Sequence, residues 1–79
     1  MKTIVDKQTN TSRYLVEDDY NINMLDDRIE MGDPNNIDFI IGDLNFWNAS
    51  VITDVTAPED WEGCRYSCSN KGVFTAISE

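Results

Sequence analysis

The stretch Trp61-Glu-Gly-Cys-Arg-Tyr-Ser-Cys-Ser-Asn-Lys-Gly-Val-Phe-Thr-Ala-Ile77 decides the fold class of this chain. It consists of two alternating runs on either side of Ser69-Asn-Lys-Gly72. Glycine adopts the positive φ that a tight chain reversal demands, so the pattern predicts a β-hairpin. Short alternating runs separated by Asn, Asp and Gly continue along the whole sequence, which favours an all-β domain.

Six more runs precede this hairpin, and each has the period of two that is typical of β-strands. We expect strands at residues 3–7, 12–17, 20–24, 29–31, 37–41 and 49–55. In the fifth run, Ile37, Phe39 and Ile41 form one apolar face. Ile40 lies on the other face, and apolar residues on both faces are typical of a covered strand. This run is therefore expected to be central or covered on both sides.

The connections between the runs are mostly short and polar. The strongest turn signal is Asp33-Pro-Asn-Asn36, and residues 56–63 form a longer connection with one helical turn expected after Pro58. Apolar residues do not recur at helical spacing over three turns, so no substantial helix is expected. The sequence thus predicts a single all-β domain over residues 1–79, with seven or eight short strands in an antiparallel meander folded as a small sandwich or open barrel.

Length and composition limit how this domain is stabilised. A chain of 79 residues buries only roughly 60% of its unfolded surface, so its core is modest although 41% of its residues are hydrophobic. Small domains gain further stability from disulfides, metals or association, and the first two are poorly supplied here. We therefore expect a homodimer or higher homo-oligomer, with flexibility confined to the first residue or two and to Ser78-Glu79.

The charge balance excludes two classes of partner. Fifteen acidic against six basic residues give a net charge of −9, which repels nucleic acids and anionic membranes. The excess serves either solubility or an acidic face that docks a basic protein by mimicking nucleic acid. The N-terminus lacks an apolar region of signal-peptide length, so a cytoplasmic protein is expected.

The residue types present do not indicate an active site or a cofactor site. The chain has no histidine, and two thiols with neither a base nor a metal-ligand partner do not indicate a nucleophile or a zinc site. If Cys64 and Cys68 share a strand, their α-carbons lie roughly 13 Å apart, too far for a disulfide. Both are then expected to be reduced core residues. The sequence predicts a protein that is not an enzyme and has no cofactor.

Acidic side chains leave a weaker alternative open. Adjacent carboxylates occur at 17–19, 26–27 and 59–60, all in expected turns where solvent keeps them ordinary. Oxygen-rich turns also suit Ca²⁺, and two sets of residues offer such ligands. They are residues 33–36 with Asp38, and Asp43 with Asn45 and Asn48. Neither set has the spacing of a known calcium loop, and Asn and Asp favour turns for conformational reasons.

The most suggestive side chains are Phe46, Trp47 and Trp61, which are large apolar groups in polar loops. Such groups either fold back as a lid over a small core or stand out as a protein-interaction surface. Exposed strand edges serve the same purpose by pairing across subunits.

Two segments resemble a known group of proteins: Ile41-Gly-Asp-Leu-Asn-Phe-Trp-Asn-Ala-Ser50 and Val55-Thr-Ala-Pro-Glu-Asp-Trp-Glu-Gly-Cys-Arg-Tyr66. They are similar to small uncharacterised proteins encoded by tailed phages of marine cyanobacteria, as is the start Met1-Lys-Thr-Ile-Val5. The likeness covers about half of the chain, and the second segment is its more specific part. Residues 70–74 depart from the closing hairpin of that group. The resemblance implies a phage or marine viral origin and supplies no activity and no site residues.

These expectations combine into one functional hypothesis. The chain is expected to be a non-enzymatic phage-type structural or accessory protein that acts by protein-protein interaction and self-assembly. Its place would be the cytoplasm of an infected bacterial host or the virion, with a host or virion protein as a further partner. The alternative is an acidic inhibitor that mimics nucleic acid and blocks a basic host enzyme.

Overall fold

Eight short strands in two antiparallel sheets make up the computed structural model, which describes residues 1–77. The strands are β1 (Lys2–Asp6), β2 (Thr11–Val16), β3 (Ile22–Met24), β4 (Ile29–Asp33), β5 (Asn36–Ile41), β6 (Ala49–Ile52), β7 (Tyr66–Cys68) and β8 (Phe74–Ala76). The expectation of an all-β chain with seven or eight strands is confirmed. The flexibility expected at Ser78-Glu79 lies outside the described residues.

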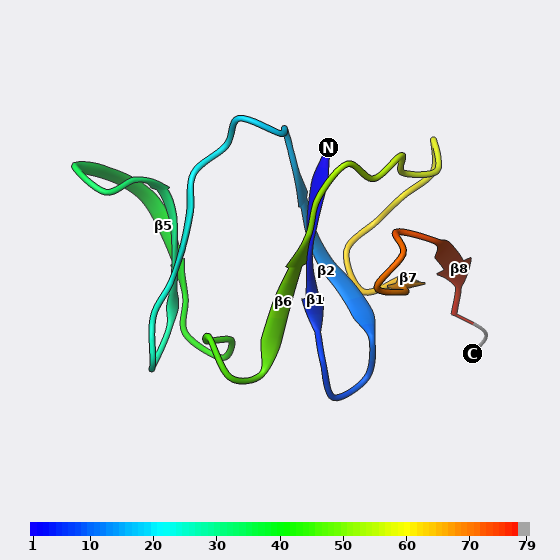
Figure 1. The fold of residues 1–79 in the computed structure, drawn as a ribbon, viewed down its shortest axis with the longest axis horizontal. Coiled ribbons are helices and arrows are strands. Elements are labelled where there is room, and N and C mark those ends of the chain that lie inside the picture. Colours follow the sequence, from blue (N-terminus) through cyan, green and yellow to red (C-terminus); the bar gives the residue numbers. More distant parts are fainter. Residues whose placement is uncertain (78–79) are drawn as a thin grey trace.

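The two sheets differ in how the chain connects them. β3, β4 and β5 form a three-stranded meander, and the larger sheet has the order β6-β1-β2-β7-β8. After β5 the chain crosses to the larger sheet, where β6 pairs with β1 rather than with its predecessor. Figure 1 shows the β3-β4-β5 sheet beside the strands β1, β2 and β6, without closure into a barrel. The arrangement is a small, sandwich-like stack.

The main core lies between the two sheets. It consists of fully buried apolar residues from both sheets and from the segment between β5 and β6: Ile4, Ile29, Met31, Ile41, Leu44 and Ala49. Strand alternation explains the selection, because Ile29 and Met31 point inward from β4 while Glu30 between them points outward. Burying a Leu, Ile or Met side chain contributes about 1.5–3 kcal/mol, so this cluster holds the stack together.

The larger sheet is covered on its second face as well. Val5 and the hydroxyl residues Thr3 and Ser12 are buried there, under the connection of residues 53–65 and the β7-β8 hairpin (Figure 1). The hairpin turn is the expected one, with Gly72 at a φ of 82° and its N–H donated to the carbonyl of Ser69. The C-terminal third of the chain therefore forms a thin layer over this face of the sheet.

One strand assignment was wrong: β5 is not central. It is an edge strand of the smaller sheet, and Ile40 on its outer face is 53% exposed. A bulge interrupts β5, because Met31 pairs with Phe39 and Gly32 with Ile37, which leaves Asp38 as the extra residue. Gly32 has a φ of 106° at this point. In β5, apolar residues on both faces of the strand therefore do not mean that both faces are buried.

Three further expectations need correction. Cys64 lies before β7 rather than in it, has a φ of 67° and is exposed, so only Cys68 is buried. Where one helical turn was expected after Pro58, the chain makes a four-residue turn, in which the N–H of Trp61 is donated to the carbonyl of Pro58. No helix occurs within residues 1–77. The strand expected at 49–55 ends at Ile52, where the chain turns through Asp54 at a φ of 57°.

Candidate interaction site

The segment between β5 and β6, residues 43–48, is held by its own side chains. Leu44 is buried in the core and anchors the segment to it. The side-chain oxygen of Asn45 accepts the backbone N–H groups of Trp47 and Asn48, at 2.8 and 3.1 Å. The oxygen of Asn48 accepts the N–H of Asn45 at 2.7 Å. These reciprocal bonds give the segment a defined conformation, and we call it the aromatic loop.

Three other parts of the chain hold the aromatic loop in place. The N–H of Phe46 is donated to the carbonyl of Leu25, and the carbonyl of Asn48 accepts the N–H of Lys7. Arg13 on β2 forms an ion pair with Asp43 at 2.9 Å. The hydrogen bond from Arg13 lowers the pKa of the Asp43 carboxyl, and the same contact raises the pKa of Arg13. The loop is therefore fixed to both sheets.

This framework presents two aromatic side chains to the surroundings. Phe46 is 52% exposed and Trp47 is 70% exposed. Their rings meet edge to face, with centroids 5.2 Å apart and planes at 85°, a preferred geometry for aromatic pairs. A rigid pair of large apolar groups loses little conformational entropy when a partner covers it. The site is suited to protein contact.

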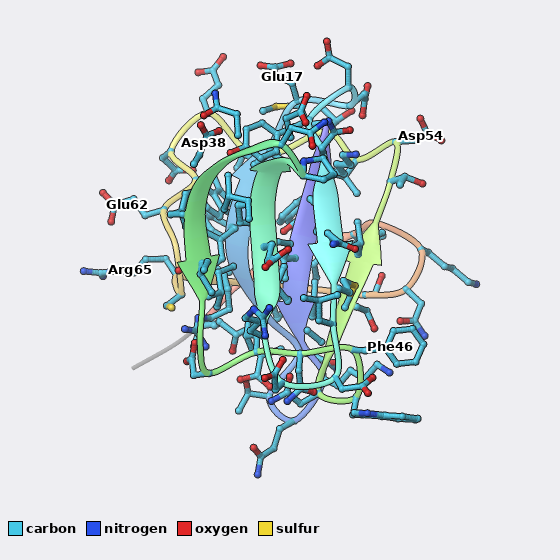
Figure 2. The ribbon with its side chains drawn as sticks, turned by 90° about the vertical axis from the view of Figure 1, so that its left-hand side faces the viewer. Glu17, Asp38, Phe46, Asp54, Glu62 and Arg65 are labelled. Atoms are coloured by element: carbon cyan, nitrogen blue, oxygen red, sulfur yellow. The ribbon has the colours of Figure 1, made fainter. Side chains whose placement is uncertain are left out.

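Trp61 does not belong to this pair. It is half-buried against the second face of the larger sheet, where its indole Nε1 donates a hydrogen bond to Ser12 Oγ at 3.0 Å. Figure 2 shows Phe46 and Glu62, the neighbour of Trp61 in sequence, on opposite sides of the molecule. Of the three aromatic residues singled out in the sequence, the structure brings two together and places the third as a cover over the sheet.

Apolar exposure on β5 was missed by the sequence reasoning. Ile37 and Phe39 are 37% and 43% exposed, although Phe39 still contacts the ring of Tyr14 at 5.8 Å between centroids. The sequence did contain a signal, because Ile40 faces away from the inward-pointing residues. A second, covering layer was the expected reason for that pattern, whereas the strand lies at an edge.

The remaining candidate sites have their polar groups engaged internally. A shallow depression lined by residues 60, 62, 65, 66, 76 and 77 contains a hydrogen bond from Tyr66 to Asp60, which raises the pKa of that phenol. Burial raises the pKa of the Cys68 thiol, which keeps it protonated and unreactive near neutral pH.

Hydrogen bonds engage oxygen atoms in both sets considered for Ca²⁺. Asp33 accepts the N–H of Asn35, and Asp38 accepts the hydroxyl of Tyr20. Asp43, Asn45 and Asn48 bind Arg13 and the backbone of their own loop, as described above. Among residues 1–77 there is no group of three or more Cys, Asp or Glu side chains arranged to hold a metal ion. The described part of the chain contains no helix long and apolar enough to cross a membrane.

Comparisons with protein families, with curated proteins and with solved structures find no match to this chain. The geometry of the aromatic loop and of the sheet edges is therefore what bears on function.

Proposed function

We propose that this protein is a non-enzymatic structural or accessory component that acts by protein-protein interaction and self-assembly. The observation that carries the proposal is the aromatic loop, a rigid segment that displays Phe46 and Trp47 to solvent. Exposing a large aromatic side chain to water costs free energy that a partner recovers on burying it. The small core of a 79-residue chain gives association a second benefit, because contact with another subunit adds buried apolar surface.

The setting that fits this proposal is the one implied by the sequence resemblance. A phage-type protein of this size would act in the cytoplasm of an infected bacterium or in the virion. Its net charge of −9 would keep free subunits soluble while the uncharged contact surface selects the partner.

Sedimentation velocity over a wide range of protein concentration tests the proposal. We expect the wild-type protein to form dimers or larger oligomers, and the double variant Phe46→Ser/Trp47→Ser to dissociate at least about tenfold more readily. Folding of the double variant should be intact, because both side chains are largely exposed. A wild-type chain that remains a 9 kDa monomer at the highest concentrations would overturn the proposal.

The matched control is Ile40→Thr on β5. It removes an exposed apolar side chain of similar exposure, 53%, from a different surface and keeps a β-branched residue in a strand. Its association should equal that of the wild type. If Ile40→Thr weakens association as strongly as the double variant does, general surface hydrophobicity and not the aromatic loop drives assembly.

A second candidate function is the acidic inhibitor that mimics nucleic acid. The observation that favours it is a concentration of carboxylates at the end of the molecule opposite the aromatic loop. That end comprises the β2-β3 connection, the β4-β5 turn and the segment after β6, with Glu17, Asp38 and Asp54 visible together in Figure 2. Competition with duplex DNA for a basic DNA-binding protein, abolished by high salt, would support it. Lack of competition at low salt would reject it.

A further inference from the structure

The free edge of β6 adjoins the aromatic loop directly. β6 is the first strand of the larger sheet, and within residues 1–77 it pairs with β1 alone. Residues 44–53, which span the loop and the strand, include no charged side chain, although 27% of the chain is charged. An edge strand with open backbone groups is a template for pairing with another strand. The edge strand and the part of the loop after Asp43 therefore form one continuous uncharged segment.

The other three sheet edges in the described chain carry features that oppose pairing. β3 and β8 have only three residues each. β5 is interrupted by the bulge at Asp38, whose carboxylate also places a negative charge on the strand. Short strands, bulges and charges are the means by which proteins protect their edges. β6 has four residues, keeps its register with β1 throughout and has neither charge nor proline.

We propose that β6 pairs with β6 of a second copy of this chain, in antiparallel orientation across a two-fold axis, to form one continuous sheet. The inference rests on the proposed function, and it names the partner and the contact. The N–H of Lys7 is donated to the carbonyl of Asn48, so alternation leaves the backbone groups of Ala49, Val51 and Thr53 facing the free edge. Those groups are the ones that the second copy would bind.

Charge complementarity favours this occupant. Antiparallel pairing brings the start of β6 in one copy beside the end of β6 in the other, so Asn48 of one copy lies opposite Asp54 of its partner. Lys7 faces Asn48 from the β1 side, two strand spacings or about 10 Å from that Asp54 along the backbone, a gap that a lysine side chain can span. Both side chains are exposed, and neither has an ion-pair partner within residues 1–77. Figure 2 shows Phe46 and Asp54 at opposite ends of the side along which β6 runs.

The aromatic loop supplies about a third of the area that a dimer needs. At their observed exposure, Phe46 and Trp47 offer roughly 250 Å² of surface in each copy, against about 800 Å² per partner in a standard interface. In the paired arrangement they lie beside residues 53–55 of the other copy. The paired strands and these residues contribute the remaining area.

A charge-reversal cycle tests the contact. Lys7→Glu should raise the dimer dissociation constant by about tenfold, because two symmetry-related attractions become repulsions. In an Asp54→Asn background the same change should cost only about twofold, because the repelling carboxylate is gone. Asparagine tolerates the left-handed backbone at position 54, so this background leaves the fold unstrained. Arg65→Glu, on the opposite side in Figure 2, is the control for net charge and should have little effect.

Thr53→Pro tests the backbone pairing itself. It removes an edge-facing N–H at an exposed position just beyond β6, and should raise the dissociation constant at least about tenfold. If the Thr53→Pro protein does not fold, the charge-reversal cycle alone tests the β6 contact. A charge cycle without coupling, or a folded Thr53→Pro protein that associates normally, overturns the β6 contact. The proposed function then still stands if Phe46→Ser/Trp47→Ser dissociates, whereas a monomeric wild type overturns both.

Discussion

At the scale of single residues, the most constrained contact is the hydroxyl network beneath Trp61. Thr3 donates its hydroxyl proton to the carbonyl of Tyr14 at 2.7 Å, so the bond between Thr3 and Ser12, at 2.6 Å, must use the proton of Ser12. Ser12 Oγ then accepts the indole N–H of Trp61. Thr3 and Ser12 are fully buried, and the network satisfies both.

Breaking this network should cost measurable stability. We expect Ser12→Ala and Trp61→Phe each to lower the free energy of unfolding by about 1–2 kcal/mol, because each leaves a partner's polar group without its bond. The double variant should lose less than the sum, since both changes remove the same hydrogen bond. Urea unfolding followed by circular dichroism measures all three. Ile40→Thr, at a 53% exposed position outside the proposed contact, is the control and should change stability by less than about 0.5 kcal/mol.

At the scale of elements, the bulge between β4 and β5 determines which face each residue of β5 presents. Gly32 makes this bulge possible, because a Cβ added there would lie 2.9 Å from the backbone nitrogen of Asp38 and its φ is 106°. The bulge also directs Asp38 toward Tyr20, whose hydroxyl donates to the carboxylate at 2.6 Å. That hydrogen bond raises the pKa of the Tyr20 phenol.

Gly32→Ala should therefore destabilise the smaller sheet. We expect the free energy of unfolding to fall by about 2–4 kcal/mol, because the new Cβ meets backbone atoms and the residue is forced into a left-handed conformation. Gly42→Ala is a matched control in the connection just after β5, where an added Cβ meets nothing within 4 Å. A thermal melt that ranks Gly32→Ala equal to Gly42→Ala would contradict this role for the bulge.

These elements also show what sequence patterning can predict. The positions of Ile29 and Met31 and the turn at Gly72 follow from period-two alternation and from glycine's freedom, and both are local properties. The pairing of β6 with β1 depends on residues more than 40 apart, which no local pattern specifies. The edge position of β5 was misread because Ile40 gives the same alternation whether water or protein covers it.

The candidate site was predictable to a similar degree. Phe46 and Trp47 were identified from the contrast between large aromatic groups and a polar loop, which is visible in sequence. The separate place of Trp61 was not, because its hydrogen bond to Ser12 joins positions 49 residues apart. Cys64 was assigned to a strand face, although its φ of 67° takes it out of the extended conformation.

At the scale of the whole molecule, two electrostatic effects act on association in opposite directions. Each copy carries a net charge of −9, so two copies repel each other over the distance that salt leaves unscreened. The proposed contact between Lys7 and Asp54 is attractive, but it involves only one pair in each half of the dimer. Contacts made by the uncharged residues 44–53 are insensitive to screening.

The balance predicts that added salt strengthens self-association. The Debye length falls from about 10 Å at 0.1 M to about 3 Å at 1 M, which removes most of the long-range repulsion while the apolar contact remains. We expect sedimentation equilibrium to report a dissociation constant several-fold lower at about 0.5 M NaCl than at about 0.05 M. The decrease should be steeper for Lys7→Glu, whose subunits repel more strongly. A dissociation constant that rises with salt would instead mean that charge attraction drives assembly, which is the behaviour expected of the acidic end and a basic partner.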